Sequence, residues 1–194
     1  MMESEHADKD SAVPAIHGSV FMVGLMGSGK TSVGKVLARL LGKVFFDSDH
    51  EIERATGVRI QEIFEVEGEP GFRTREKKMI ADLAQRDNIL LATGGGAVLA
   101  PENRAELKAH GTVIYLRAPV KALLRRTQRD RNRPLLQVAD PAAKLRELYD
   151  QRDPLYREVA HLIVDTGNQS VRALAEQIIK QLAQHQMASQ PAIH

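Results

Sequence analysis

The sequence predicts an α/β protein in which helices cover both faces of a parallel sheet. Short apolar runs alternate along the chain with amphipathic stretches, and these stretches are long enough for the crossover connections that parallel strands require. The composition indicates one folded domain, since 43% of the 194 residues are hydrophobic and 27% are charged. Sites in such folds lie beyond the carboxyl ends of the strands, which is where functional motifs are expected.

Five short apolar segments are the candidate strands, and candidate helices separate them. The strands are expected at residues 19–23, 44–46, 89–92, 113–116 and 162–164. The first helix is indicated by apolar residues at i, i+3, i+4, i+7 and i+8, namely Val33, Val36, Leu37, Leu40 and Leu41. Further helices are expected near residues 48–56, 72–86, 101–109, 119–128, 141–158 and 169–185. This order predicts a five-stranded parallel sheet.

The two ends of the chain are expected to lie outside the folded domain. Residues 1–17 are acidic and lack the basic start and apolar centre of a signal peptide, so they predict a disordered extension whose deletion spares activity. Residues 186–194 are predicted to form a flexible tail, which leaves a single domain over residues 18–185. Without an export signal, the expected location is cytoplasmic.

Composition excludes several functional classes. The chain has no cysteine, which rules out disulfides, zinc-thiolate sites and a thiol nucleophile. Its formal net charge of +2 is too small for a general nucleic-acid binder. No apolar run approaches the roughly 18 residues of a membrane span, so neither nucleic acid nor a membrane is an expected partner.

A phosphate-binding loop follows the first strand directly. The segment Gly24-Leu25-Met26-Gly27-Ser28-Gly29-Lys30-Thr31 fits the pattern of Gly, four residues, Gly, Lys and Ser or Thr. Its glycines let backbone N–H groups point at phosphate oxygens, and the next helix adds its positive dipole end. Lys30 is expected to neutralise the transferred phosphoryl group and Thr31 to bind magnesium. The predicted nucleotide-binding residues here are Gly27, Ser28, Gly29, Lys30, Thr31 and Ser32.

Two acids, Asp47 and Asp49, stand at the end of the second predicted strand. One could reach magnesium through water, while the other accepts a hydrogen bond or a proton from a substrate hydroxyl. Helix capping is the alternative, with Ser48 or Asp49 as the N-cap and Glu51 as the reciprocal partner. Both roles can hold together.

Four further motifs follow in order: Gly71-Phe72-Arg73, Thr93-Gly94-Gly95-Gly96, Arg133-Pro134-Leu135-Leu136 and Arg152-Asp153-Pro154-Leu155-Tyr156. With the phosphate loop and the two acids, this ordered set resembles the shikimate kinase family over roughly residues 20–182. The resemblance implies a P-loop nucleoside-kinase-like, three-layer fold with a mobile lid. It also implies a monomer that uses ATP and Mg²⁺ to phosphorylate the 3-hydroxyl of shikimate, a step towards chorismate and the aromatic amino acids.

The resemblance assigns a carboxylate clamp to two arginines. Arg73 and Arg152 would bind the shikimate carboxylate, since a guanidinium presents two parallel donors. The alternative for Arg73 is an ordinary surface charge that is solvated or pairs at i, i+4 on its helix. For Arg152, an ion pair with neighbouring Asp150 or Asp153 competes with the clamp.

The acids and the triple glycine complete the implied pocket. Asp49 would hold the shikimate hydroxyls and orient or deprotonate the attacking one, and Asp47 would act in magnesium binding. Gly94, Gly95 and Gly96 would line the pocket, because absent side chains let a flat ring approach the backbone. A tight turn is the alternative reading of these glycines.

Five arginines occur within nine residues: Arg125, Arg126, Arg129, Arg131 and Arg133. Such a segment repels itself unless phosphates are near, which predicts a lid near residues 127–140 that closes over bound nucleotide. By resemblance, Arg133 would reach the ATP phosphates and join Lys30 and Asp49 as a catalytic residue, while Arg126 would lie against adenine. The alternative is a nucleic-acid or partner-binding patch, which few interleaved aromatics support.

Two other functional classes stay open at this point. A gluconate or nucleoside-monophosphate kinase would share the phosphate loop and an arginine-rich lid, and would differ in its acceptor pocket. A nucleotide-dependent switch would keep the phosphate loop but need neither the triple glycine nor the pair of arginines.

Overall fold

The computed structural model describes residues 13–127 and 134–189. Five parallel strands form one sheet in the order β2-β3-β1-β4-β5. Their bounds are β1 Ser19–Val23, β2 Val44–Asp47, β3 Ile89–Ala92, β4 Gly111–Arg117 and β5 Leu162–Asp165. The predicted five-stranded parallel sheet is confirmed, and each strand lies within two residues of its expected bounds.

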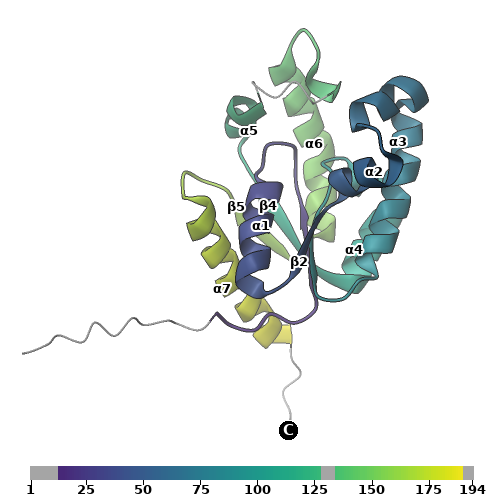
Figure 1. Ribbon diagram of the computed structural model, residues 1–194. Helices are drawn as coiled ribbons and strands as arrows, with labels where there is room; N and C mark the ends of the chain where they lie inside the picture. Colours follow the sequence, from purple (N-terminus) through teal and green to yellow (C-terminus); the bar gives the residue numbers. More distant parts are fainter. Residues whose placement is uncertain (1–12, 128–133, 190–194) are drawn as a thin grey trace, which may run out of the picture.

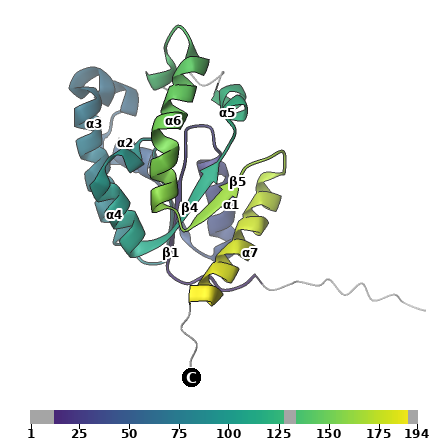
Figure 2. The ribbon, with the colours of Figure 1, turned by 180° about the vertical axis from the view of Figure 1, so that it is seen from behind.

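Helices cover both faces of this sheet, as Figures 1 and 2 show from opposite sides. On one face lie α1 and α7, and on the other lie α3, α4 and α6. The helices are α1 Lys30–Leu41, α2 Ser48–Thr56, α3 Ile60–Ala84, α4 Pro101–His110, α5 Val120–Thr127, α6 Pro141–Val159 and α7 Val171–Ser189, with the short turns η1 Ala97–Leu99 and η2 Pro134–Leu136. None of the helices in the described ranges is long and apolar enough to cross a membrane.

Strand β1 is the centre of the protein, and all five of its residues are buried. Because side chains alternate along a strand, Phe21 and Val23 pack into the core on the α3, α4 and α6 side. Val20 and Met22 pack into the other core, under α1 and α7. The continuous apolar run of β1 therefore reflects burial on both faces.

The strand order brings three loops together at one edge of the sheet. Strand β3 lies between β1 and β2, with Met22 opposite Ala92 on one side and Asp47 opposite Ala92 on the other. The segments that follow β1, β3 and β2 therefore leave the sheet side by side. These segments carry the phosphate loop, the triple glycine and the acidic pair.

Helix α3 differs from the helix predicted at residues 72–86. It begins at Ile60 and contains one non-helical residue, Gly68, with φ 70° and ψ −177°. Pro70 follows within the helix, where it removes a backbone donor and favours a kink. The sequence analysis missed the first segment because this interruption breaks the helical pattern.

The folded part of the chain extends beyond both predicted limits. Helix α7 continues to Ser189, so residues 186–189 are helical and the C-terminal tail predicted from residue 186 begins too early. At the other end, Ile16 is 7% exposed and belongs to the core under α1 and α7. His17 and Gln186 exchange two hydrogen bonds, at 3.1 and 2.8 Å. Neither boundary could be predicted correctly from the sequence, because both depend on this contact between the two ends of the domain.

Lys43 ties the N-terminal segment to the rest of the protein. Its ammonium group donates to the carbonyls of Ile16 and Gly18 at 2.9 and 2.6 Å, and to Oδ1 of Asn88 at 2.8 Å. Only 7% of Lys43 is exposed, and burial lowers its pKa. Residues 16 and 17 therefore belong to the domain rather than to the extension predicted over residues 1–17.

His161 connects the end of α6 to strand β4. The N–H of Val113 donates to its ring nitrogen Nδ1 at 2.9 Å, and the backbone N–H of His161 donates to the carbonyl of Val113 at 2.8 Å. Burial lowers the pKa of His161, and the neighbouring His185 and Lys108 lower it further. Since a protonated Nδ1 cannot accept, this contact requires the neutral ring.

Candidate active site

The phosphate loop joins β1 to α1 and has the backbone that its glycines allow. Gly24, Gly27 and Gly29 have φ values of 147°, 77° and 101°, a region that residues with a Cβ rarely adopt. A Cβ at Gly27 would also lie 2.8 Å from Cγ2 of Thr127. Ser28 is buried, while Ser32 is an exposed residue in the first turn of α1.

Lys30 points back into this loop. Its Nζ donates to the carbonyl oxygens of Gly24 and Leu25 at 2.7 and 2.9 Å and to the hydroxyl of Ser28 at 3.4 Å. The residue is 8% exposed. The ammonium group of Lys30 therefore lies inside the phosphate loop. A cation next to a helix N-terminus favours the binding of anionic phosphates.

Asp47 links the phosphate loop to helix α2. Its Oδ2 accepts from the Thr31 hydroxyl at 2.7 Å, and its Oδ1 accepts from the backbone N–H groups of Asp49 and His50 at 3.1 and 3.4 Å. Asp47 is therefore the N-cap of α2, and the alternative that assigned the cap to Ser48 or Asp49 is wrong. Capping by this carboxylate leaves its role in magnesium binding a prediction.

Ser48 has a different role from capping. It is fully buried, and the N–H of Gly94 donates to its hydroxyl at 2.9 Å. This bond fastens the triple glycine to the start of α2. It places Gly94 beside the acid that follows Ser48 in the chain.

The triple glycine makes room for side chains of the site. A Cβ at Gly94 would lie 2.7 Å from Oδ1 of Asp49 and 2.8 Å from Oε1 of Glu76, and a Cβ at Gly96 would lie 2.3 Å from Arg73. A Cβ at Gly95 would lie 3.3 Å from the backbone nitrogen of Met26. The sequence analysis explained the three glycines by the approach of a substrate ring, and the structure adds that they also leave room for Asp49, Glu76, Arg73 and the phosphate loop.

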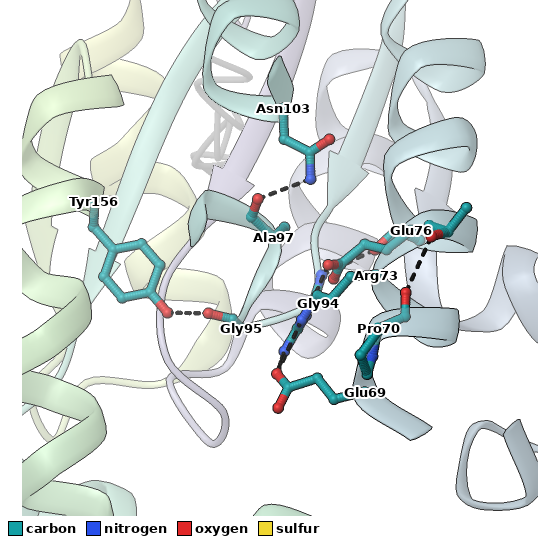
Figure 3. Close-up of polar contacts among 11 residues, drawn as sticks. Glu69, Pro70, Arg73, Glu76, Gly94, Gly95, Ala97, Asn103 and Tyr156 are labelled. Atoms are coloured by element: carbon teal, nitrogen blue, oxygen red, sulfur yellow. Dashed lines mark hydrogen bonds and ion pairs between the residues drawn. The ribbon is translucent and has the colours of Figure 1, made fainter. Parts of the chain in front are cut away.

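Arg73 is held by two glutamates of its own helix, as Figure 3 shows. Its Nη1 donates to Glu76 at 2.7 Å, and its Nη2 and Nε donate to Glu69 at 2.8 and 3.1 Å. The side chain is only 19% exposed, so Arg73 is not a solvated surface charge, while the pairing at i, i+4 considered from the sequence does occur, with Glu69. Such fixed pairing orients the guanidinium before a ligand binds.

Glu76 is the site residue that sequence analysis missed. It is 1% exposed, and burial raises its pKa, while the charges of Arg73 and Arg152 oppose the rise. Its spacing of i+3 from Arg73 was the available signal. That spacing is common on solvated helices and could not reveal the burial.

Arg152 lies on α6 and is 2% exposed. Its Nε and Nη1 are buried without a hydrogen-bond partner among the described residues. Asp153 instead accepts from Tyr115 at 2.7 Å and from Arg157 at 2.6 Å, and so is already engaged elsewhere. A buried, incompletely paired guanidinium is costly, and an anionic ligand next to it would offset that cost.

One cavity of about 460 Å³ brings the predicted acceptor residues together. It is lined by all six of them: Asp49, Arg73, Gly94, Gly95, Gly96 and Arg152. Met26 of the phosphate loop, Phe64 and Phe72 of α3 and Leu135 of η2 also line it. The cavity therefore has charged and apolar walls and adjoins the phosphate loop.

The predicted lid is described only at its two ends. Arg126 donates to the carbonyl of Gly27 at 3.3 Å and to Oγ1 of Thr166 at 3.4 Å, so it spans from the phosphate loop to the segment after β5. Arg133, Arg129 and Arg131 lie outside the described residues. The prediction for Arg133 therefore stays a prediction.

The oxygen ligands available to a divalent cation are few. No group of three or more His, Cys, Asp or Glu side chains suited to a metal occurs in the described ranges. Thr31 and Asp47 nevertheless place two oxygen atoms 2.7 Å apart beside the phosphate loop. This donor set fits Mg²⁺, which commonly binds through one or two protein oxygens together with phosphates and water.

Comparisons with known proteins agree on one family. The model of the shikimate kinase family matches residues 26–183. A shikimate kinase of Nitrosomonas europaea is 58% identical over 176 residues, which cover 91% of this chain and 83% of the relative. The solved structure of shikimate kinase from Acinetobacter baumannii in complex with shikimate has a TM-score of 0.87 and 52% identity, covering 88% of this chain and 96% of that one.

A gluconokinase from Sinorhizobium meliloti is a more distant structural match. It has a TM-score of 0.52 and 17% identity, covering 91% of this chain and 100% of the other. At this level the likeness concerns the fold alone, and the acceptor pocket must decide between the two kinases.

Proposed function

The chain belongs to the shikimate kinase family, and from this premise we infer how its own residues divide the work of the reaction. The protein is a kinase that transfers the γ-phosphoryl group of ATP to the 3-hydroxyl of shikimate. The reaction leads towards chorismate and the aromatic amino acids. One observation carries the division of labour: the six residues expected to bind the acceptor line one cavity that adjoins the phosphate loop.

Shikimate is held by its carboxylate and its hydroxyls. Arg73 and Arg152 bind the carboxylate, supported by the presence of both in the lining of the cavity and by the buried donors of Arg152. Asp49 accepts hydrogen bonds from the ring hydroxyls. The glycine turn of residues 94–96 forms the base on which the ring lies.

ATP is bound by the phosphate loop through the backbone of residues 27–32 and the ammonium group of Lys30. Lys30 and Arg133 offset the negative charge on the transferred oxygens. Arg126 lies beside the adenine, which agrees with its contacts to Gly27 and Thr166. These residues act mainly by positioning and by electrostatics, since phosphoryl transfer needs little covalent help from the protein.

In the chemical step the 3-hydroxyl oxygen forms a bond to the γ-phosphorus while the bond from that phosphorus to the β–γ bridging oxygen breaks. Asp49 orients the hydroxyl and accepts its proton as the new bond forms. The electrons of the broken bond stay on the ADP oxygen. Positioning of the two reactants in adjoining sites supplies much of the rate.

A magnesium ion, when bound, would neutralise phosphate charge next to Thr31 and Asp47. These two residues would hold it directly or through water. Because the protein supplies so few ligands, the ion is expected to arrive with the nucleotide.

The remaining features of the proposal concern the protein's surroundings. The proposed active unit is a monomer, because the phosphate loop and all six acceptor residues of one copy already form an adjoining pair of sites. Its cosubstrate ATP favours a cytoplasmic location. Neither nucleic acid nor a membrane takes part in the proposed reaction.

The test is release of ADP by the purified protein with shikimate, with gluconate, with a nucleoside monophosphate and without an acceptor. We expect ADP release to depend on shikimate, and equal release in all four conditions would refute the assignment. Asp49→Asn should lower kcat by about 10²-fold or more, the scale of general acid–base catalysis. The matched control is Asp82→Asn, which removes the same charge from an exposed position on α3.

Lys30→Met should also lower kcat by about 10²-fold or more, since it removes one preorganised charge that stabilises the transferred group. Near-normal turnover in this variant would refute the role of Lys30. Unchanged kcat/KM in Asp49→Asn would refute the role of Asp49 and leave the reaction itself established by the first measurement.

A further inference from the structure

Tyr156 is a buried tyrosine whose hydroxyl contacts the backbone of the active site. It lies on α6 and is 0% exposed. Its Oη donates to the carbonyl of Gly95, as Figure 3 shows. Gly95 is the middle residue of the glycine turn, and its α-carbon backs onto Met26 of the phosphate loop.

Tyr156 also lies next to Arg152 on α6. The two residues are four positions apart, so they share one face of the helix. Burial raises the pKa of Tyr156, and the positive charge of Arg152 opposes the rise. The bond from Tyr156 Oη to Gly95 therefore ties the face of α6 that carries Arg152 to the turn after β3.

The ring of Tyr156 is held in one orientation by packing. Its centroid lies 4.9 Å from that of Tyr115 on β4, with the planes tilted by 31°. Tyr115 is itself 1% exposed, and its Oη donates to Asp153 at 2.7 Å. Both hydroxyls are therefore paired, but only that of Tyr156 contacts residues that line the cavity.

A purely structural role does not account for this difference. Satisfying a buried hydroxyl needs one partner, and Tyr115 meets that need away from the site. Tyr156 Oη instead donates to the glycine turn, and it does so from the helix face that carries Arg152; Gly95 and Arg152 both line the cavity and come from different elements. Asn103 and Ser48 already anchor the same turn, at Ala97 and Gly94, so stability alone does not require a third anchor.

We propose that Tyr156 is a positioning residue for the kinase reaction: its hydroxyl fixes the spacing between Arg152 and the Gly94–Gly96 turn, and thereby presents the guanidinium to the acceptor carboxylate. This inference rests on the proposed function of the site. Because the bond lies on the acceptor side, Tyr156 controls binding of shikimate and leaves binding of ATP largely unaffected.

The test compares Tyr156→Phe with Tyr115→Phe. Each substitution keeps the ring stack and removes one buried hydroxyl, so their effects on thermal stability should be similar. We expect Tyr156→Phe to raise KM for shikimate by about tenfold, the effect of losing one buried hydrogen bond. KM for ATP should stay within about twofold in both variants, and Tyr115→Phe should leave KM for shikimate within the same range.

Equal changes in KM for shikimate in the two variants would overturn the proposal, as would an equal rise in both KM values of Tyr156→Phe. The wild-type protein is measured in parallel. If it shows no shikimate-dependent turnover, the proposed function fails; if it does, the KM values of the two variants test the role of Tyr156 alone.

A second measurement needs no variant at the site. The chain has only three tyrosines, so ¹³C-labelling of tyrosine rings yields a spectrum that Tyr115→Phe and Tyr149→Phe suffice to assign. Shikimate is expected to shift the Tyr156 signal more than the Tyr115 signal, and ADP alone should not. An unmoved Tyr156 signal at saturating shikimate would overturn the proposal even if Tyr156→Phe failed to fold.

Discussion

Replacing Gly96 with alanine tests whether the glycine turn makes room for Arg73. Gly96 has φ −95° and ψ −1°, values that alanine adopts without strain. The new Cβ would lie 2.3 Å from both Nη1 and Nη2 of Arg73, whereas ordinary contact begins at 3.4 Å. The guanidinium must therefore retreat by about 1.1 Å, the difference between those two distances.

This displacement should act on catalysis far more than on folding. The obstructed atoms are the end of a flexible side chain, so the free energy of unfolding should fall by no more than about 1 kcal/mol. A 1 Å misplacement of a positioning group can cost about 10²-fold in rate. We therefore expect kcat/KM for shikimate to fall by about 100-fold, with KM for ATP within about twofold of the wild-type value.

Steady-state kinetics of a double-mutant cycle measure this directly. In an Arg73→Ala background the clash is absent, so Gly96→Ala should add little further loss. Losses that add fully in the double variant would refute the reasoning, because they would show that the alanine acts independently of Arg73. An equal rise of KM for ATP would refute it too.

Two further predictions concern stability. Deleting residues 1–17 should lower Tm measurably, since it removes buried Ile16 and its carbonyl contact with a buried lysine; a deletion that ends at residue 12 is the control, and equal Tm values would contradict the packing. The pKa of His161 is lowered in the folded protein, so the unfolded chain takes up the proton first as the pH falls. The stability that this group contributes is therefore complete above pH 6.5, its ordinary pKa, and decreases as the pH drops below that value. The loss should be about 1 kcal/mol or less, because the exposed ring is screened, and urea unfolding of His161→Asn should show a flatter dependence between about pH 5.5 and 7.5.

The inner strands β1 and β3 could be predicted because burial on both faces requires continuous apolar runs. Val20 to Val23 and Ile89 to Ala92 are runs of this kind, and the structure buries each of them. The first segment of α3 could not be predicted in the same way, since Gly68 and Pro70 interrupt the periodicity on which the prediction depends. Packing of Ile63 against Ile52 and Phe72 stabilises this segment, and such packing overrides local preference.

The phosphate loop could be predicted residue by residue. Its chemistry lies in neighbouring positions, where three glycines, Lys30 and Thr31 act within one turn of backbone and the first turn of α1. Asp47 was found for the same reason, since it directly ends a strand. Its bond to Thr31 links positions 16 residues apart and was not expected from the sequence, which offered only magnesium binding, substrate contact and helix capping as roles for the two acids.

Spacing and residue type along the chain thus defined the reaction's phosphate-binding half and named the arginines and glycines of the other half. The tertiary structure alone decided which side chains pair with one another, because pairing depends on which side chains are brought into contact and shielded from water. Asp153 binds Tyr115 and Arg157 and leaves Arg152 to the cavity. Glu76 and Tyr156 acquire their roles only when three separate elements meet, since a carboxylate or hydroxyl gains a specific partner from burial and not from its place in the sequence.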